Sequence, residues 1–326
     1  MFVLECNIQI GNYSFTQVKA VKVVKDINLL SDTATIELPA SAMFGNKEKG
    51  FERRALETTI KVGDPVSITL GYKDILLKTV FKGFVTSIYP NQPTVKISCE
   101  DAVYLIRKKN LNKNFIGTSL QEVLQYITVG TGVKISEAIP AVNFEKFLLK
   151  NVNGAKALQK IKDTYGLTIY INDDNELYAG LKYAVSPEKE VSYDLQKNVV
   201  KHNLKFTTSE NVRLRIKVVG VKKDNTKISV FVGDQDGEQR TIFRYNITDP
   251  KQLKEIGENE LLQMKYTGYR GSLTGFFIPF ADRGMKCKLH NTKFPERQGM
   301  YYVPKVVMSY GTSGIRIQTE LGTKLL

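Results

Sequence analysis

The sequence predicts a mainly β fold of the α+β class, in which antiparallel barrels or sandwiches lie on either side of a small α/β domain. Short alternating or β-branched runs recur between Gly, Asp, Asn and Pro residues, which is typical of antiparallel strands; examples are TATIEL, PVSITLGY, TVKISCED and GIRIQTEL. Helical spacing is found mainly in the middle of the chain. The length of 326 residues exceeds one small core and fits two or three domains of roughly 100 to 150 residues each.

The first clear strand leads directly into a long insertion. In residues 31–39, Ala34, Ile36 and Leu38 point to one face while threonine and glutamate point to the other, as in a half-buried strand. The following loop, 40–62, mixes charged groups with large apolar ones and has little regular pattern. Loops of this length inside compact domains usually have a function, and exposed apolar groups are costly unless a partner covers them. The loop therefore points to assembly with another chain.

The middle of the chain contains two similar helix–strand units. In the first, helical spacing around Leu124 precedes Gly132 and a short strand; in the second, spacing around Leu158 precedes Gly166 and another strand. Each glycine stands where a helix ends and a strand begins, a position that favours a left-handed backbone. Two such units in tandem predict a small α/β domain over residues 104–183.

The two ends of the chain are weakly similar to each other. Residues 81–101 and 299–322 share an aromatic-rich strand, a tight turn and a returning alternating strand. We therefore expect related barrels at the two ends, 1–103 with the long loop 40–62, and 184–326 with a helical insert near 250–265. Whether the two ends are a true internal duplication is left open.

Charge and cysteine content limit the environment and the partners. With 47 basic and 33 acidic residues the net charge is +14, which favours an acidic partner without identifying it. Cys6, Cys99 and Cys287 are odd in number and far apart, which favours reduced, buried thiols over disulfides or a zinc site. No apolar run approaches the roughly 18 residues of a membrane span, and the first residues do not resemble a signal peptide. We expect the chain to fold in a cytoplasm.

The sequence shows no set of residues that is typical of an enzyme active site. His202 and His290 have no nucleophile or carboxylate at a recognisable spacing, and metal-ligand spacings, phosphate-binding glycine loops and nucleophile elbows are absent from the sequence. We therefore expect no catalytic residue, no metal and no cofactor. A cell-wall hydrolase stays an alternative, because the spacing of the paired carboxylates that it would use is set by the fold.

One strand has a basic face. Arg213, Arg215 and Lys217 alternate with apolar residues, so the three cations share one face of the strand. This face is either a solvated outer surface or a basic stripe aimed at an acidic partner. A basic nucleic-acid-binding protein is the second alternative, although no recognisable nucleic-acid-binding motif accompanies the stripe and we do not expect nucleic acid as a partner.

The order of these parts resembles the baseplate hub proteins of phage tails, a family that includes the late control D proteins and the hub portion of VgrG-type spike proteins of type VI secretion. The resemblance runs over nearly the whole chain and is carried by DINLLSDTATIELP, VGDPVSITLGY, FKGFVTSIYPNQPTVKISCED, GTSLQEVLQYI and YYVPKVVMSYGTSGIRIQTELG. It implies a structural protein of the virion tail baseplate, not an enzyme. It also implies two tube-like β-barrels per chain around the α/β domain, in a homotrimer that forms a pseudo-sixfold ring.

The resemblance further implies partners and interface residues. The ring would join the hexameric tail tube to the trimeric central spike, contact other baseplate proteins, and assemble in the bacterial host cytoplasm. VgrG proteins continue into a spike, so we expect the spike to be a separate protein here. The long loop falls where tube-type barrels reach a neighbouring subunit, so the implied interface residues are Met43, Phe44, Phe51, Arg53 and Arg54. The resemblance assigns no role to Arg213, Arg215 and Lys217, whose part in an interface is inferred from charge alone.

Overall fold

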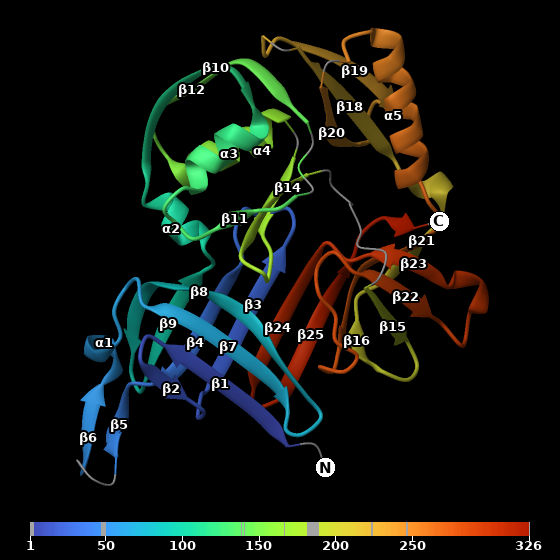
Figure 1. Ribbon diagram of the computed structural model, residues 1–326. Helices are drawn as coiled ribbons and strands as arrows, with labels where there is room; N and C mark the ends of the chain where they lie inside the picture. Colours follow the sequence, from blue (N-terminus) through green and yellow to red (C-terminus); the bar gives the residue numbers. More distant parts are fainter. Residues whose placement is uncertain are drawn as a thin grey trace.

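A computed structural model describes residues 3–46, 50–137, 139, 141–165, 167–180, 189–222, 224–245 and 247–325 (Figure 1). The chain is mainly β, with several sheets and a few short helices, which confirms the predicted class. In this part of the chain no helix is both long and apolar enough to cross a membrane.

The largest sheet has twelve strands and contains both ends of the chain. The first half of the chain contributes β1 (Leu4–Ile10), β2 (Tyr13–Phe15), β3 (Ala20–Asp26), β4 (Thr33–Pro39), β7 (Pro65–Tyr72), β8 (Leu76–Asn91) and β9 (Thr94–Glu100). The last part contributes β16 (Val199–His202), β17 (Lys205–Thr207), β21 (Gly268–Gly275), β24 (Lys305–Gly311) and β25 (Gly314–Leu321). The order is β16-β21-β25-β24-β3-β4-β9-β8-β7-β1-β2, with β17 paired to β21.

The two ends of the chain are joined by strand pairing. β24 lies antiparallel to β3, from Lys305 opposite Asp26 to Tyr310 opposite Val21. No sheet among the described strands closes on itself, so the two separate tube-like barrels expected from the sequence are not confirmed. A further sheet of the last part packs on the same core; it consists of β15 (Glu190–Asp194), β22 (Lys286–His290), β23 (Gly299–Tyr302) and β26 (Lys324–Leu325).

One hydrophobic core lies beneath both halves of the twelve-stranded sheet. Ile97, Ile36, Val21, Tyr310 and Ile315 lie opposite one another in successive strands from β9 to β25 and pack on this core. The alternation read from the sequence produces this row, because every second side chain of a strand points to the same face. The two halves therefore share one core.

The other face of the same strands is polar. Ser98, Thr35, Lys22, Ser309 and Arg316 form the neighbouring row, again in successive strands from β9 to β25. None of these five side chains is buried. The sheet therefore has one apolar and one polar face across both halves.

The α/β domain packs around a second core, to which Val219 and Val221 from later in the chain also belong. A capping box starts α3, in which the Ser119 side chain accepts from the Glu122 backbone and Glu122 accepts from the Ser119 backbone. Gly132 has φ +72°, as predicted for a left-handed position, and Gly166 lies outside the described residues. The elements are α2 (Val103–Arg107), β10 (Asn110–Ser119), α3 (Leu120–Thr128), β11 (Lys134–Ile135), β12 (Asn143–Asn153), α4 (Gly154–Tyr165), β13 (Thr168–Ile171) and β14 (Glu176–Gly180).

A three-stranded sheet with one helix is inserted between β17 and β21. Its elements are β18 (Leu214–Val221), β19 (Lys227–Gly233), β20 (Glu238–Tyr245) and α5 (Pro250–Met264), the helix expected near 250–265. From sequence, these strands belong to the second barrel; in the structure they form a separate sheet, in which β18 is central and β20 runs parallel to it. Leu253 of α5 packs on Ile216 and Val218, which makes one face of β18 the small core of this insert.

Candidate assembly interface

The long loop 40–62 contains regular structure that its sequence pattern did not reveal. β5 (Ser41–Asn46) and β6 (Gly50–Ala55) form an antiparallel hairpin, followed by the short helix α1 (Leu56–Thr59). The hairpin projects from the body of the molecule (Figure 1). Each face of the hairpin carries both apolar and charged side chains, because both faces of a projecting hairpin contact water along most of its length.

The hairpin register separates the predicted interface residues into two groups. Met43 lies opposite Arg53 and Gly45 opposite Phe51, so Met43, Phe51 and Arg53 share one face. The Met43 and Phe51 residues are 59% and 61% exposed, which is high for large apolar side chains. We call Met43, Phe51 and Arg53 the exposed hairpin face. It places two large apolar side chains of the loop where another molecule can reach them.

Phe44 lies on the other face and holds the hairpin to the body. Its ring is 4.9 Å from that of Tyr13 and 6.4 Å from that of Phe15, edge-on in both cases. Arg54, on the same face, pairs with Glu52 at 2.7 Å. Phe44 is therefore an anchor within the chain, and its predicted role in contacting a partner stays untested.

Replacing Phe44 with alanine is expected to loosen the hairpin without unfolding the protein. Two aromatic contacts, each contributing about 0.5–1.5 kcal/mol, are lost. Backbone amides of β5 and β6 should then exchange hydrogen at least tenfold faster, while those of β4 and β9 should keep their rates. A Met43→Ala variant, on the exposed hairpin face, serves as the control; equal acceleration in both variants would contradict the anchor role.

The basic strand face is partly used within the chain. The Arg215 guanidinium lies 4.3 Å from the centre of the Phe231 ring, and the Lys217 amine lies 5.6 Å from it. Arg213 pairs instead with Asp236. Arg215 and Lys217 lie on the face of β18 opposite α5, and Arg213 directly precedes the strand. β18 lies in the upper part of Figure 1, whereas the hairpin lies at the lower left. The structure does not bring the two sets of predicted interface residues together.

A charged cluster with a buried centre joins three parts of the chain and was not foreseen from the sequence. We call Lys25, Asp32, Asp173, Asp282 and Arg283 the junction cluster. Lys25 is 2% exposed and its amine lies 2.7 Å from Asp173 and 2.9 Å from Asp282. Arg283 pairs with Asp32, and both side chains are almost fully buried. The cluster ties the first half, the β13–β14 turn of the α/β domain and the segment before β22 to one another.

Burial and pairing shift the pKa values in opposite directions within this cluster. Burial raises the pKa of Asp32 to about 7, although Arg283 and Lys25 oppose the rise. Burial alone would lower the pKa of Lys25, but Asp282, Asp173 and Asp32 outweigh it and the pKa is raised. For Asp173, whose side chain is 62% exposed, burial would raise the pKa, but attraction and hydrogen bonding to Lys25, together with Arg283, outweigh it and the pKa is lowered. Lys25 therefore stays charged, whereas Asp32 binds a proton near neutral pH.

The stability of the protein is expected to fall as the pH rises from 5 to 8. The pKa of Asp32 is about 7 in the folded protein, against an ordinary value of 3.8. The folded state therefore binds this proton more tightly than the unfolded state does. The resulting stabilisation is complete below pH 3.8 and is lost progressively as the pH rises to about 7. The linkage corresponds to about 2–3 kcal/mol over this range. Chemical denaturation at several pH values measures it, with Asp32→Asn, which cannot ionise, as the control. An equal slope in both proteins would contradict the assignment.

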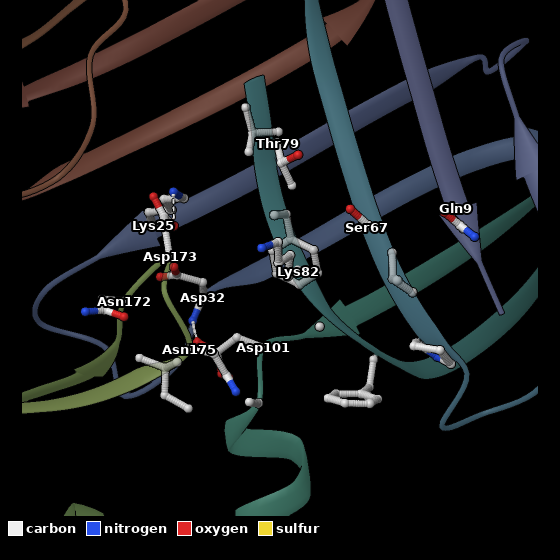
Figure 2. Close-up of a pocket in the computed structure, with 18 of the residues that line it drawn as sticks. Gln9, Lys25, Asp32, Ser67, Thr79, Lys82, Asp101, Asn172, Asp173 and Asn175 are labelled. Carbon is white, nitrogen blue, oxygen red and sulfur yellow. Dashed lines mark hydrogen bonds and ion pairs between the residues drawn. The ribbon is translucent and has the colours of Figure 1, made fainter. Parts of the chain in front are cut away.

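A cavity of about 680 Å³ lies beside the junction cluster. Figure 2 shows Lys25, Asp32 and Asp173 grouped at one side of the cavity, with Ser67 and Gln9 across from them. The walls come from the first half and from the β13–β14 turn. In the part of the chain that the structure describes, no group of His, Cys, Asp or Glu side chains is arranged to hold a metal ion.

The three cysteines are free and buried, as predicted. Burial raises the pKa of Cys6, Cys99 and Cys287 to about 12 in each case. The reactive thiolate is therefore almost unpopulated at neutral pH. Cysteines introduced on the surface can be oxidised without interference from the native ones.

Comparison with known proteins identifies the fold. The chain superimposes on the 43 kDa tail protein of prophage MuSo2 from Shewanella oneidensis with a TM-score of 0.66 at 15% identity, covering 98% of each chain. It also matches a tail protein from Neisseria meningitidis MC58, with a TM-score of 0.66 at 10% identity, covering 99% of this chain and 96% of that one. An E. coli component of the type VI secretion system, which has structural similarity to T4 bacteriophage tail proteins, matches with a TM-score of 0.58 at 9% identity over 97% of this chain and 76% of its own.

These likenesses show a fold shared with phage tail proteins and with a type VI secretion component, so the resemblance read from the sequence is confirmed at the level of the fold. No protein-family model and no curated protein matches the sequence.

Proposed function

We propose that this protein is a structural baseplate hub of a phage tail or a related contractile injection system, in which three copies form a pseudo-sixfold ring between a hexameric tail tube and a trimeric central spike. The observation that carries the proposal is that each chain already contains two similar halves joined edge to edge by β3 and β24. Three chains with two such halves each supply the six positions of the ring.

The two halves repeat the same local structure. Gly63 and Gly284 both have positive φ, 96° and 80°, just before β7 and β22. The Gly63 N–H donates to the Val85 carbonyl and the Gly284 N–H donates to the Val303 carbonyl, both at 2.8 Å. Each valine in turn donates back to the residue after the glycine. Such a match in backbone hydrogen bonding supports a structural repeat, which the sequence similarity left open.

The strand orders also match. The first half runs β3-β4-β9-β8 and the second half runs β16-β21-β25-β24, in the same sheet. Ile97 of β9 and Ile317 of β25 occupy equivalent core positions, which makes Ile88 and Met308, their partners, equivalent as well. β3 therefore corresponds to β16, and the second part of β8 corresponds to β24.

This correspondence identifies two strands that lack a neighbouring strand on one side. β24 is paired with β3 on its outer side, but the equivalent part of β8, from Ile88 to Asn91, has no described strand on that side. β16, the counterpart of β3, is likewise at the end of the sheet order. Exposed edges are templates for pairing with another chain. We infer that β8 of one copy pairs with β16 of the next as β24 pairs with β3.

Two exposed side chains lie where this pairing would bury them. Ser309 and Lys22 face each other across the β3–β24 joint. Their equivalents in strand register are Tyr89 and Lys201, because the register of β16 shifts at Val200. Tyr89 is 56% exposed, and Lys201 is exposed as well. Because one edge differs from the other, the contact is head-to-tail and generates a ring when the rotation closes. The polar face of the sheet would then continue around the ring.

The partners follow from the position of the ring. In the proposed assembly the protein contacts itself, the tail tube, the central spike and other baseplate proteins, and it is built in the host cytoplasm before it joins the virion tail. Its function is to match a sixfold to a threefold symmetry, which needs geometry and no catalytic residue.

A disulfide between the two edges tests the proposal. Residues directly opposite each other in antiparallel strands have Cα atoms about 4.5–5.5 Å apart, within the range of a disulfide. A chain carrying Tyr89→Cys and Lys201→Cys should form covalent trimers on mild oxidation. Each single variant, which lacks the second thiol, should stay uncrosslinked. An assembled trimer that does not crosslink would contradict the edge pairing.

A further inference from the structure

The segment between β21 and β22 occupies the same place in the second half as the β5–β6 hairpin does in the first. It follows β21, the counterpart of β4, and ends at Gly284, the counterpart of Gly63. The hairpin thus stands where the second half has the shorter stretch 276–283. The contacts of the short stretch show where a segment leaving this point of the fold goes.

The short stretch contacts the other half of the molecule. The Phe277 ring lies 6.3 Å from that of Tyr72 at the end of β7, in an edge-on arrangement. The Lys78 amine, near the start of β8, lies 4.8 Å from the centre of the Phe280 ring. Arg283 continues into the junction cluster. The stretch therefore crosses from the second half to the region around the β7–β8 turn of the first half.

We propose that the β5–β6 hairpin of one copy docks on the turn between β22 and β23 of the next copy, around Phe294. This inference rests on the proposed ring. Because β22 and β23 correspond to β7 and the first part of β8, the turn 291–298 of the second half is the counterpart of the β7–β8 turn. The hairpin crosses the joint between copies as the stretch 276–283 crosses the joint within one copy.

The two surfaces are chemically compatible. Phe294 is 44% exposed, and the Arg297 guanidinium lies 4.2 Å from the centre of its ring. The exposed hairpin face offers Met43 and Phe51, and thioether–aromatic and aromatic–aromatic contacts are both favourable. In Figure 1 the hairpin lies at the far left and β22 and β23 lie at the far right. The left side of one copy therefore meets the right side of the next, in the same sense as the β8–β16 pairing.

Paired cysteines distinguish this contact from the ring itself. A chain with Phe51→Cys and Phe294→Cys should crosslink between copies on mild oxidation, alongside the Tyr89→Cys, Lys201→Cys chain. A Phe51→Cys, Ile116→Cys chain is the control, since Ile116 is 79% exposed but belongs to the α/β domain. Crosslinking of the edge pair without the hairpin pair would overturn the docking site and leave the ring standing. Failure of both pairs would overturn both.

A double-mutant cycle gives an independent measurement. Phe51→Ala and Phe294→Ala should each weaken trimer formation by about tenfold, as expected for aromatic anchors in an interface. If the two side chains contact each other, the double variant should be little weaker than either single one. If the two substitutions weaken trimer formation independently, so that their effects multiply in the double variant, the Phe51–Phe294 contact is contradicted even if the trimer still forms.

Discussion

Replacing Arg283 with alanine is expected to lower the free energy of unfolding by about 3–5 kcal/mol, because it leaves the buried Asp32 carboxyl without its ion-pair partner. The side chain is 5% exposed, pairs with Asp32, donates 2.6 Å to the Ile171 carbonyl, and stacks 4.2 Å from the Tyr170 ring. All three interactions cross between parts of the chain that are far apart in sequence. Equilibrium unfolding in urea at pH 7 measures the loss.

The matched control is another arginine over an aromatic ring. Arg297 stacks on Phe294 at 4.2 Å, but its side chain is 37% exposed, and its ion pair is with the adjacent Glu296. Arg297→Ala should cost less than about 1 kcal/mol, as for exposed ion pairs. If Arg283→Ala and Arg297→Ala lower the free energy of unfolding by the same amount, the buried junction cluster does not hold the three parts of the chain together.

The second large effect concerns assembly. A Lys201→Asp variant is expected to shift the trimer–monomer equilibrium toward monomer by more than a hundredfold, because its short carboxylate would lose water in the closed edge, whereas the long lysine side chain can keep its amine in solvent. The fold of the single chain should be unaffected, since Lys201 is exposed and substitutions at such sites change stability by about 0.5 kcal/mol or less. Sedimentation over a range of concentrations measures the equilibrium.

A charge-matched partner should recover part of this loss. Tyr89→Lys places a cation opposite the new carboxylate, so the Lys201→Asp, Tyr89→Lys chain should assemble at least tenfold better than Lys201→Asp alone. Ile116→Asp, on the α/β domain, should assemble normally. No recovery in the double variant would show that the two positions do not face each other.

The strands with one buried face could be predicted from sequence, whereas features without periodicity could not. TATIEL, PVSITLGY and GIRIQTEL became β4, β7 and β25, because a core under one face enforces alternation. The helices around Leu124 and Leu158 were equally clear. The β5–β6 hairpin was missed because both of its faces are largely exposed, so no alternation marks it.

The long-range contacts were beyond the sequence pattern. Pairing of β3 with β24 brings together segments almost at opposite ends of the chain, and local periodicity contains no information on which strands become neighbours. Lys25 resembles a surface lysine in the sequence, but it is buried among carboxylates from two distant segments. One signal of the buried cluster was present in the sequence. Asp282 and Arg283 are two charged residues that directly follow an apolar run.

The mass of the purified protein in solution, measured by light scattering from low to high concentration, tests the ring most directly. The ring predicts a species near three times 36.8 kDa that dissociates on dilution. A monomer at every concentration, in a protein whose edge cysteines also fail to crosslink, would contradict it.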